Sequence, residues 1–176
     1  MTAVYPGDSR VIDVLRTRDG ELLTVRPIEP ADKAELERHL QHLGERSRYQ
    51  RFLRPIRQLT ERDLAYFTEL DHRDHEGLIA ETPEGDPIGV ARYIRLPDRP
   101  GVAEMAMAIT DDWQGRGVGT ALLRILAERA RTADVRSFLG ICLTENFDMQ
   151  QLLRQLGPSS TTKPLRDGTV EVEVQL

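Results

Sequence analysis

The stretch DDWQGRGVGT, residues 111–120, places glycines at positions 115, 117 and 119 between a predicted strand, residues 102–109, and a predicted helix, residues 120–131. A glycine turn can direct successive backbone N–H groups at one point, and the helix that follows adds its own unpaired donors and the positive end of its dipole. Together these groups form a site for a phosphate oxyanion. Side chains would block the approach of the ligand, which accounts for the glycines. The stretch therefore predicts a phosphate-binding turn.

Two nucleotide sites and one structural role compete for this turn. A P-loop requires Lys and then Ser or Thr after its last glycine, but Thr120 and Ala121 follow here. A dinucleotide fingerprint requires G-x-G-x-x-G at the first βαβ unit of a doubly wound fold, whereas the spacing here is G-x-G-x-G and the preceding strand ends a meander. The P-loop is excluded and the dinucleotide site is disfavoured. The structural alternative, in which the glycines only tighten a strand-to-helix turn, stays open.

Upstream of the turn, the sequence predicts a β-hairpin and three helices. Asp19-Gly20 favours a tight hairpin turn, Gly44 is the expected stop of the first helix, and Thr60 with Asp63 resembles an N-cap pair for the third. The expected strands are residues 11–15 and 22–28, and the expected helices are residues 30–43, 46–53 and a segment that starts after Thr60.

Downstream, the sequence predicts a meander that leads into a βαβ unit, then a helix and a final strand. The nearly continuous apolar run at residues 135–143 is typical of a strand covered on both faces and parallel to its predecessor. Residues 170–174 alternate valine with glutamate, as in a half-buried strand. The meander comprises residues 77–80, 88–96 and 102–109, and the helices are residues 120–131 and 146–156. The predicted fold class is α/β (α+β), with a mixed, mostly antiparallel sheet and helices on both faces.

Length and composition fit one domain. We expect residues 1–20 to be an N-terminal extension with the first hairpin strand, and residues 21–176 to form the domain proper. Asp8, Asp13 and Asp19 interrupt the start of the chain where a signal peptide would be apolar, and no run is long enough to span a bilayer, so a cytoplasmic location is expected. The net charge of −5 argues against nucleic acid or a membrane surface as partner and is compatible with an amine-bearing one.

Histidine and cysteine give no prediction of a metal site. His39 with His42, and His72 with His75, have a spacing that could begin such a site, but no cluster of carboxylates or cysteines accompanies them. Cys142 is the only cysteine and falls in a predicted interior strand, so it is interpreted as a core residue.

Gln114, Gly117 and Gly119 match the coenzyme A signature Q/R-x-x-G-x-G/A of the GCN5-related N-acetyltransferase (GNAT) family. The order of hairpin, helices, meander, βαβ unit, helix and last strand also resembles that family. The resemblance implies an acyl-CoA N-acyltransferase fold in which the strand before the signature splays from the next one. Met107, Ala108 and Ile109 would then offer backbone groups to the pantetheine arm. The pyrophosphate would lie on the turn formed by Gly115, Arg116, Gly117, Val118, Gly119 and Thr120.

Four further stretches look like the acetyltransferase domain of bacterial Pat-type protein-lysine acetyltransferases. They are residues 25–28 (VRPI), 47–52 (SRYQRF), 103–104 (AE) and 113–117 (WQGRG). The resemblance implies acetyl-CoA as co-substrate, no metal, and an amine acceptor, with a protein lysine ahead of a small amine. It carries no expectation of control by a cyclic nucleotide, since it covers only the acetyltransferase domain.

Glu104 is the candidate general base. On a strand over residues 102–109 it shares a face with Ala106 and Ala108, whose small side chains leave room for an amine or a water. An ammonium cannot attack a thioester, so a base must first take its proton. The Pat-type group has its catalytic glutamate at this offset from the signature glutamine. The alternative is a solvated glutamate paired with a nearby arginine.

Asn146 and Leu153 bear on the end of the reaction. Asn146 opens a predicted helix, where it can act as an N-cap, and the resemblance adds a contact to coenzyme A. Many relatives carry a tyrosine seven residues after this asparagine that protonates the departing thiolate, but Leu153 stands there. A tyrosine acid at that position is ruled out. A thiol with a pKa near ~8.5 is still a tolerable leaving group as its anion.

A basic run lies in the first half of the chain. It contains Arg46, Arg48, Arg51, Arg54 and Arg57, interrupted by Tyr49 and Phe52. In an acidic chain this pattern favours a solvated helix face with its aromatic residues turned inward. The functional alternative, taken from the family resemblance, is a wall of the acceptor site.

These observations lead to one hypothesis and three alternatives. We expect an acetyl-CoA-dependent N-acetyltransferase in which an amine attacks the thioester directly. The alternatives are a non-catalytic module that binds acyl-CoA, an acetyltransferase of a small-molecule amine and, more remotely, a dinucleotide-binding enzyme. The sequence does not distinguish a monomer from a homodimer, and it does not identify the acceptor or the preferred acyl chain.

Overall fold

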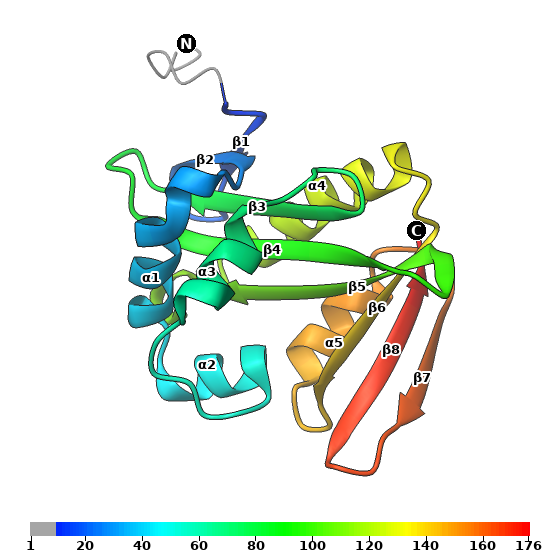
Figure 1. Cartoon of the computed structure of the whole chain (residues 1–176). Helices are drawn as coiled ribbons and strands as arrows, with labels where there is room; N and C mark the ends of the chain where they lie inside the picture. The colour runs from blue at the N-terminus through cyan, green and yellow to red at the C-terminus, as the bar shows by residue number, and fades with distance from the viewer. Residues whose placement is uncertain (1–9) are drawn as a thin grey trace.

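One sheet organises the computed structural model, which describes residues 10–176 (Figure 1). Its strand order is β1-β2-β3-β4-β5-β6-β8-β7, and every neighbouring pair is antiparallel except the parallel pair of β5 and β6. The strands are β1 Asp13–Arg16, β2 Leu22–Pro27, β3 His75–Glu81, β4 Pro87–Leu96, β5 Arg99–Ile109, β6 Ser137–Leu143, β7 Ser160–Pro164 and β8 Thr169–Gln175. The predicted mixed, mostly antiparallel sheet is confirmed. Of the predicted N-terminal extension, residues 1–9 lie outside the described residues.

Three helices cover one face of the sheet. They are α1 (Lys33–His42), α2 (Glu45–Phe52) and α3 (Glu61–Thr68), and a 3-10 turn at Pro30–Asp32 precedes them. Leu36, Leu40 and Leu64 from these helices pack with Ile28 and Ile79 of the sheet side in one apolar cluster. Burial of this stripe, rather than helix propensity, is what stabilises such short helices.

The predicted cap of α3 is confirmed, and α1 ends where the sequence predicts, just before Gly44, but not through a left-handed glycine. The Thr60 hydroxyl accepts from the backbone N–H of Asp63, and the Asp63 carboxylate accepts from the N–H of Thr60. α1 ends at His42 without a left-handed glycine, and Gly44 instead caps the start of α2 with a φ of −64°. A side chain at Gly44 would overlap the carboxylate of Asp111. This glycine therefore serves a close approach, not a helix stop.

Two helices cover the opposite face. α4 (Val118–Thr132) and α5 (Phe147–Arg154) bury Leu122, Leu126 and Leu153 in the larger apolar cluster, which also includes Phe138 and Met105 of the sheet. The predicted helices on both faces are confirmed. The main core thus lies between the sheet and α4 with α5.

The sheet opens between β5 and β6. These strands pair only over Val102–Met105 and Ser137–Gly140. Beyond that point β5 continues beside β4 to Ile109, and β6 continues beside β8 to Leu143. Figure 1 shows β6 and β8 turning away from the direction of β5. The splay implied by the family resemblance is present.

One strand was missed. β7 (Ser160–Pro164) pairs with β8 at the edge of the sheet, and its side chains are exposed. Its sequence STTKP contains no alternating apolar residues, so periodicity gave no signal. Pairing with the predicted strand β8, which is confirmed, is what makes this segment extended.

Candidate active site

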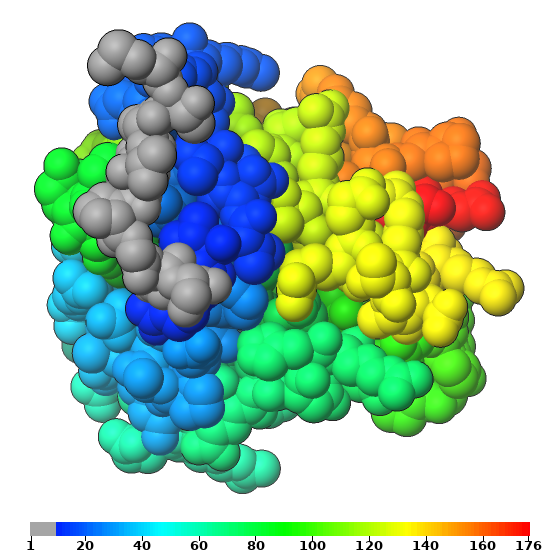
Figure 2. Space-filling model, turned by 90° about the horizontal axis from the view of Figure 1, so that it is seen from above, coloured from blue at the N-terminus to red at the C-terminus, as the bar shows by residue number. Residues whose placement is uncertain are grey.

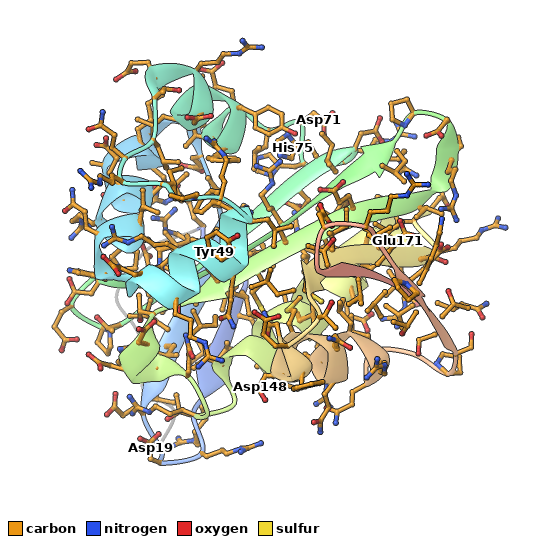
Figure 3. The ribbon with its side chains drawn as sticks, turned by 90° about the horizontal axis from the view of Figure 1, so that it is seen from below. Asp19, Tyr49, Asp71, His75, Asp148 and Glu171 are labelled. Carbon is orange, nitrogen blue, oxygen red and sulfur yellow. The ribbon has the colours of Figure 1, made fainter. Side chains whose placement is uncertain are left out.

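A groove of about 830 Å³ lies at the opening between β5 and β6. Its walls come from α2, from the last residues of β5, from the glycine turn with the first residues of α4, from the end of β6 and from α5. Seen from below, α2 with Tyr49 and α5 with Asp148 lie to the two sides of this opening (Figure 3). The topology therefore collects at one groove the segments that the sequence singled out separately.

The glycine turn at one end of the groove has the backbone that the sequence predicts. Gly115 and Gly117 have φ angles of +71° and +89°, a left-handed region that favours glycine. Gly119 instead lies against the Met107 side chain, since an added Cβ would be 3.3 Å from its Cε. Gly117 caps α4 without any side-chain hydrogen bond to the first turn. The N–H groups at the start of this helix are thus left to a ligand or to water, as an anion site requires.

The Arg116 side chain does not line the groove. Its guanidinium bonds to Asp19 Oδ2 at 2.5 Å and to Glu21 Oε1 at 2.9 Å, and it stacks on the Trp113 ring at 4.0 Å from the centroid. These carboxylates raise the pKa of Arg116. Val118 is also turned away and is 2% exposed in the core. Only the backbone groups of these two residues remain available for the role predicted for them.

Arg18 also lies at the glycine turn, which the sequence did not predict. It lines the groove, its backbone N–H donates to Arg116 O at 3.0 Å, and its Nη1 donates to Gly115 O at 3.4 Å. In the view from above, blue atoms of the β1–β2 hairpin border the yellow-green segment that begins α4 (Figure 2). No local signal could reveal this cation, because nearly a hundred residues separate it from the turn.

Gln114 connects the turn to β5 and α2. Its Nε2 donates to Ile109 O at 2.9 Å and to Ser47 Oγ at 3.1 Å, and Ser47 Oγ donates to Asp111 Oδ1 at 2.6 Å. The side chain of the signature glutamine therefore holds together three walls of the groove. It also contributes directly to the lining.

The backbone of β5 alternates between its two neighbours. The backbone N–H of Thr110 donates to the carbonyl oxygen of Ile88 in β4 at 2.9 Å. Ala108 lies two residues earlier, so its N–H and C=O also point toward β4. Met107 and Ile109 direct theirs to the opposite edge, where β6 has turned away. Of the three residues predicted to offer backbone groups, Met107 and Ile109 have them at the groove, and Ala108 contributes its methyl group to the lining.

Glu104 lies where the two strands part. It is exposed and belongs to the last paired segment of β5, opposite Leu139, and the groove lining begins at the next residue, Met105. Its side chain shares the α2 face of the sheet with Ala106 and Ala108, as predicted. Two arginines of that face, Arg51 and Arg92, lie within electrostatic range of it.

The start of α5 forms the wall opposite α2. Asn146 Oδ1 accepts from Met149 N at 3.2 Å, so the predicted N-cap is confirmed, and the residue also lines the groove. Leu153 is fully buried and packs on Gly140 of β6, where a side chain would overlap it. The position of the family tyrosine is therefore filled by a core residue in this chain.

The basic run divides into separate roles. Arg46 and Arg51 line the groove, whereas Arg48 donates to Leu43 O at 2.7 Å. Tyr49 is 44% exposed, so the prediction that both aromatic residues turn inward is wrong for it. Phe52 does pack inward, 6.5 Å from the ring of Phe67. An eight-residue helix has room for one apolar stripe. In α2 that stripe contains Phe52, which packs against the apolar cluster of Leu36, Leu40 and Leu64.

Cys142 and the histidines behave as structural groups. Cys142 is 2% exposed and burial raises the pKa of its thiol, which confirms the interpretation as a core residue. No group of three or more His, Cys, Asp or Glu side chains placed to hold a metal occurs within residues 10–176. Over the same residues, no helix has the length and apolar character needed to cross a membrane.

Comparisons with known proteins agree with this geometry. The model of the acetyltransferase (GNAT) family matches residues 40–157. The crystal structure of the GNAT domain of S. lividans PAT is 33% identical, with a TM-score of 0.85 over 93% of this chain and 96% of that one. The acetyltransferase Pat of Mycolicibacterium smegmatis is 32% identical over 164 residues, or 91% of this chain.

The coverage of one relative is partial, and a more distant structure shares only the fold. The chain spans about half, 48%, of the length of the M. smegmatis Pat protein. The aminoglycoside acetyltransferase AAC(6')-Ib, in complex with acetyl-CoA, is 20% identical with a TM-score of 0.63 over 87% of this chain and 93% of its own, and it shares the fold. The predicted fold class is confirmed by these structures.

Proposed function

The chain belongs to the GNAT family of N-acetyltransferases, whose co-substrate is acetyl-CoA, and from this premise we propose that it transfers an acetyl group from acetyl-CoA to a lysine side chain of a protein. The single observation that carries the proposal is the groove that joins the glycine turn at one end to the region of Glu104 at the other. The lysine rests on the likeness to Pat-type enzymes. The proposed setting is the cytoplasm, and the proposed domain is residues 21–176 with residues 1–20 as an extension.

In the proposal, one half of the groove holds the pyrophosphate and the pantetheine arm of coenzyme A. In the proposal, the N–H groups from Gly115 to Thr120 bind the pyrophosphate, because a helix start without a capping side chain attracts an anion. Arg18 adds a positive charge beside them. The backbone of Met107 and Ile109, with Asn146 across the gap, would hold the pantetheine arm.

The proposed chemistry is direct attack. The Glu104 carboxylate takes one proton from the acceptor ammonium, directly or through a water, and the freed amine nitrogen bonds to the thioester carbon. The N–H of Met107 donates to the oxyanion that forms on the carbonyl oxygen. The adduct nitrogen loses its second proton to water, the C–S bond breaks, and coenzyme A leaves as its thiolate. Leu153 supplies no proton, so the thiolate departs as the anion of a thiol with a pKa near ~8.5.

Replacement of Glu104 by Gln tests this assignment. The variant keeps the size of the side chain but cannot accept the proton, so turnover should fall by about 10²- to 10⁴-fold. The measurement is release of free thiol from acetyl-CoA with a panel of lysine peptides. Glu171→Gln is the matched control, since Glu171 lies on β8 away from α2 (Figure 3) and should leave turnover unchanged.

Two results would contradict the proposal. A loss of less than about tenfold in the Glu104→Gln variant would mean that another base, or none, is at work. Saturable binding of acetyl-CoA without thiol release for any amine would favour the non-catalytic acyl-CoA module. That second function is kept because Leu153 replaces the family acid with a core side chain.

A further inference from the structure

Arg92 is a buried cation with an unused hydrogen-bond donor. It lies on β4, is 8% exposed, and its Nη1 has no hydrogen-bond partner among the described residues. Its guanidinium carbon lies 4.6 Å from the ring centroids of both Tyr66 and Phe67. Aromatic rings stabilise the flat faces of a guanidinium, but its N–H groups point outward in the plane and require acceptors. The stacking therefore does not satisfy this donor.

Arg51, a second arginine near Arg92, also has no carboxylate as an ion-pair partner among the described residues. Within residues 10–176, neither Arg51 nor Arg92 has a carboxylate oxygen within 4.0 Å. Burial and the charge of Arg92 lower the pKa of Arg51 to about 10, and burial lowers the pKa of Arg92. Among the described residues, the Tyr66 hydroxyl and the Glu104 carboxylate oppose these effects, and Glu104 is the one carboxylate that does so. The buried Arg92 and the partly buried Arg51 thus face one exposed negative charge.

Two other arginines, the buried Arg26 and the partly exposed Arg129, are neutralised directly. Arg26 is 3% exposed and bonds to both oxygens of Asp32 at 2.7 and 2.9 Å and to both oxygens of Glu81 at 2.9 and 2.7 Å. Arg129 bonds to the buried Glu76 at 2.6 Å. A buried charge without a partner is costly. The contrast indicates that a negative group from outside the chain completes the Arg51 and Arg92 pair.

The two arginines share a small cavity that opens beside the groove. The cavity has a volume of about 40 Å³, and apart from Arg51, Arg92 and His39 its walls are apolar. A water needs roughly 10–15 Å³ of such volume. A cavity of about 40 Å³ therefore has room for the three heavy atoms of a carboxylate. Arg51 and Ala108 line both the cavity and the groove. The cavity and the groove are therefore neighbours, close enough for one ligand to reach both.

The cavity lies next to Glu104. Arg92 is paired across the sheet with Ala106, and Glu104 is two residues before Ala106 on the same face. Such diagonal neighbours have Cα atoms about 7–8 Å apart, and long side chains approach more closely. A ligand with an ammonium and a carboxylate separated by a few bonds could bring the first to Glu104 and the second to the arginines.

We propose that the acceptor carries a carboxylate near its reacting amine, and that Arg51 and Arg92 bind this carboxylate while the amine reaches Glu104. The inference rests on the proposed acetyl transfer and specifies its acceptor. The same chemistry has two sources, which are an Asp or Glu side chain beside the target lysine and the α-carboxylate of a free amino acid. The experiment separates them.

The experiment compares acceptors that differ only in a carboxylate. One pair is a lysine peptide with neighbouring Glu and the same peptide with Gln, and the other is a free amino acid and its amide. In the unaltered protein, kcat/KM should be about 10- to 100-fold higher for the carboxylate member of the pair that matches the true source, mainly through KM, because charge-assisted hydrogen bonds are strong and directional. In Arg92→Met this preference should disappear.

Two controls separate recognition from folding. Arg62→Met removes an exposed arginine of α3 outside the cavity and the groove, and it should keep the full preference. Acetyl-CoA affinity should be the same in Arg92→Met as in the unaltered protein, which shows that the donor half is intact. Calorimetric binding of the same acceptor pairs in the presence of coenzyme A gives a readout that does not depend on turnover.

The outcomes are distinguishable. Equal kcat/KM and equal affinity within both pairs would overturn the carboxylate site and leave lysine acetylation standing. A preference confined to the free amino acid would support the site and overturn the protein acceptor. Absence of thiol release would contradict the proposed function, and tighter binding of the carboxylate member, lost in Arg92→Met, would still support the site.

Discussion

Arg26 on β2 and Arg92 on β4 lie on the same face of the sheet, and each is almost fully buried, at 3% and 8% exposed. Arg26 is enclosed by the carboxylates of Asp32 and Glu81, which raise its pKa. Arg92 has two aromatic rings and no carboxylate, and burial lowers its pKa. The same residue type at similar depth is therefore in opposite electrostatic situations.

The difference separates a structural ion pair from a binding position. Arg26 joins β2, β3 and the 3-10 turn before α1, so its charges are satisfied within the fold. Arg92 carries the cost of desolvation without that compensation, and it does so next to the groove. Departures from local consistency of this kind concentrate at functional sites. Three predictions test whether the contrast is real.

The largest effect is expected on removal of Arg26. Arg26→Met leaves Asp32 and Glu81 without their partner, so the free energy of unfolding should fall by about 3–5 kcal/mol. Arg92→Met should change it by less than about 1 kcal/mol, because no carboxylate is abandoned and the lost stacking is offset by removal of a desolvated charge. Urea denaturation at neutral pH measures both. Comparable losses in the two variants would remove the contrast, since Arg92 would then be a structural residue as well.

The next effect concerns His39, which lines the cavity of Arg92. Burial lowers its pKa from 6.5 to about 4, and its Nδ1 lies 3.3 Å from Pro87 O. Because the unfolded chain binds the proton first, the contribution of His39 is fully present above pH 6.5 and is lost as the pH falls toward 4. The loss for this one group is on the order of 3 kcal/mol.

The measurement for His39 is the difference between two pH profiles of unfolding. In His39→Leu the free energy of unfolding should decrease less between pH 6.5 and pH 4 than in the unaltered chain. His42→Leu is the matched control, because His42 is exposed one turn away on α1. Identical slopes for His39→Leu and the unaltered protein would show that the cavity does not disfavour an added positive charge.

The smallest effect is expected for the stacking of Tyr66 on Arg92. A cation above an aromatic ring contributes about 0.5–2 kcal/mol, so Tyr66→Leu should lower the free energy of unfolding by about 1 kcal/mol. In the Arg92→Met background the same change should cost less, and a double-mutant cycle measures the coupling. A coupling near zero would mean that the ring does not hold Arg92 in position.

Local features of the sequence predicted much of the fold. The turn at Gly115 and Gly117, the cap at Thr60 and Asp63 and the hairpin at Gly20 depend on the backbone of a few adjacent residues, so their residue types were sufficient. The strand at residues 170–174 followed from its alternation. Gly44 was misread because its reason is the nearby Asp111 carboxylate, far along the chain. β7 had no periodicity of its own and depends on β8.

The candidate site was predicted in the same uneven way. The signature and the resemblance named the glycine turn and Glu104 as candidates, but they gave no sign that the Arg116 side chain binds Asp19 and Glu21 of the hairpin. Arg18 was missed because it reaches the turn only through the fold. The roles of Glu104 and of the donor-binding residues stay predictions that the variants above test.

By itself, the sequence determined the glycine turn, the order of the elements other than β7, and the family, because these depend on local backbone chemistry and on short-range periodicity. Only the tertiary structure decided where β5 parts from β6, which side chains enter the groove, and which buried charges find a partner. Those outcomes depend on distances between residues that are remote in the chain, and electrostatic interactions in a desolvated environment depend steeply on such distances. Arg26 and Arg92 have the same side chain. The fold alone places one in an ion pair that joins neighbouring elements and leaves the other with an unused donor for a ligand.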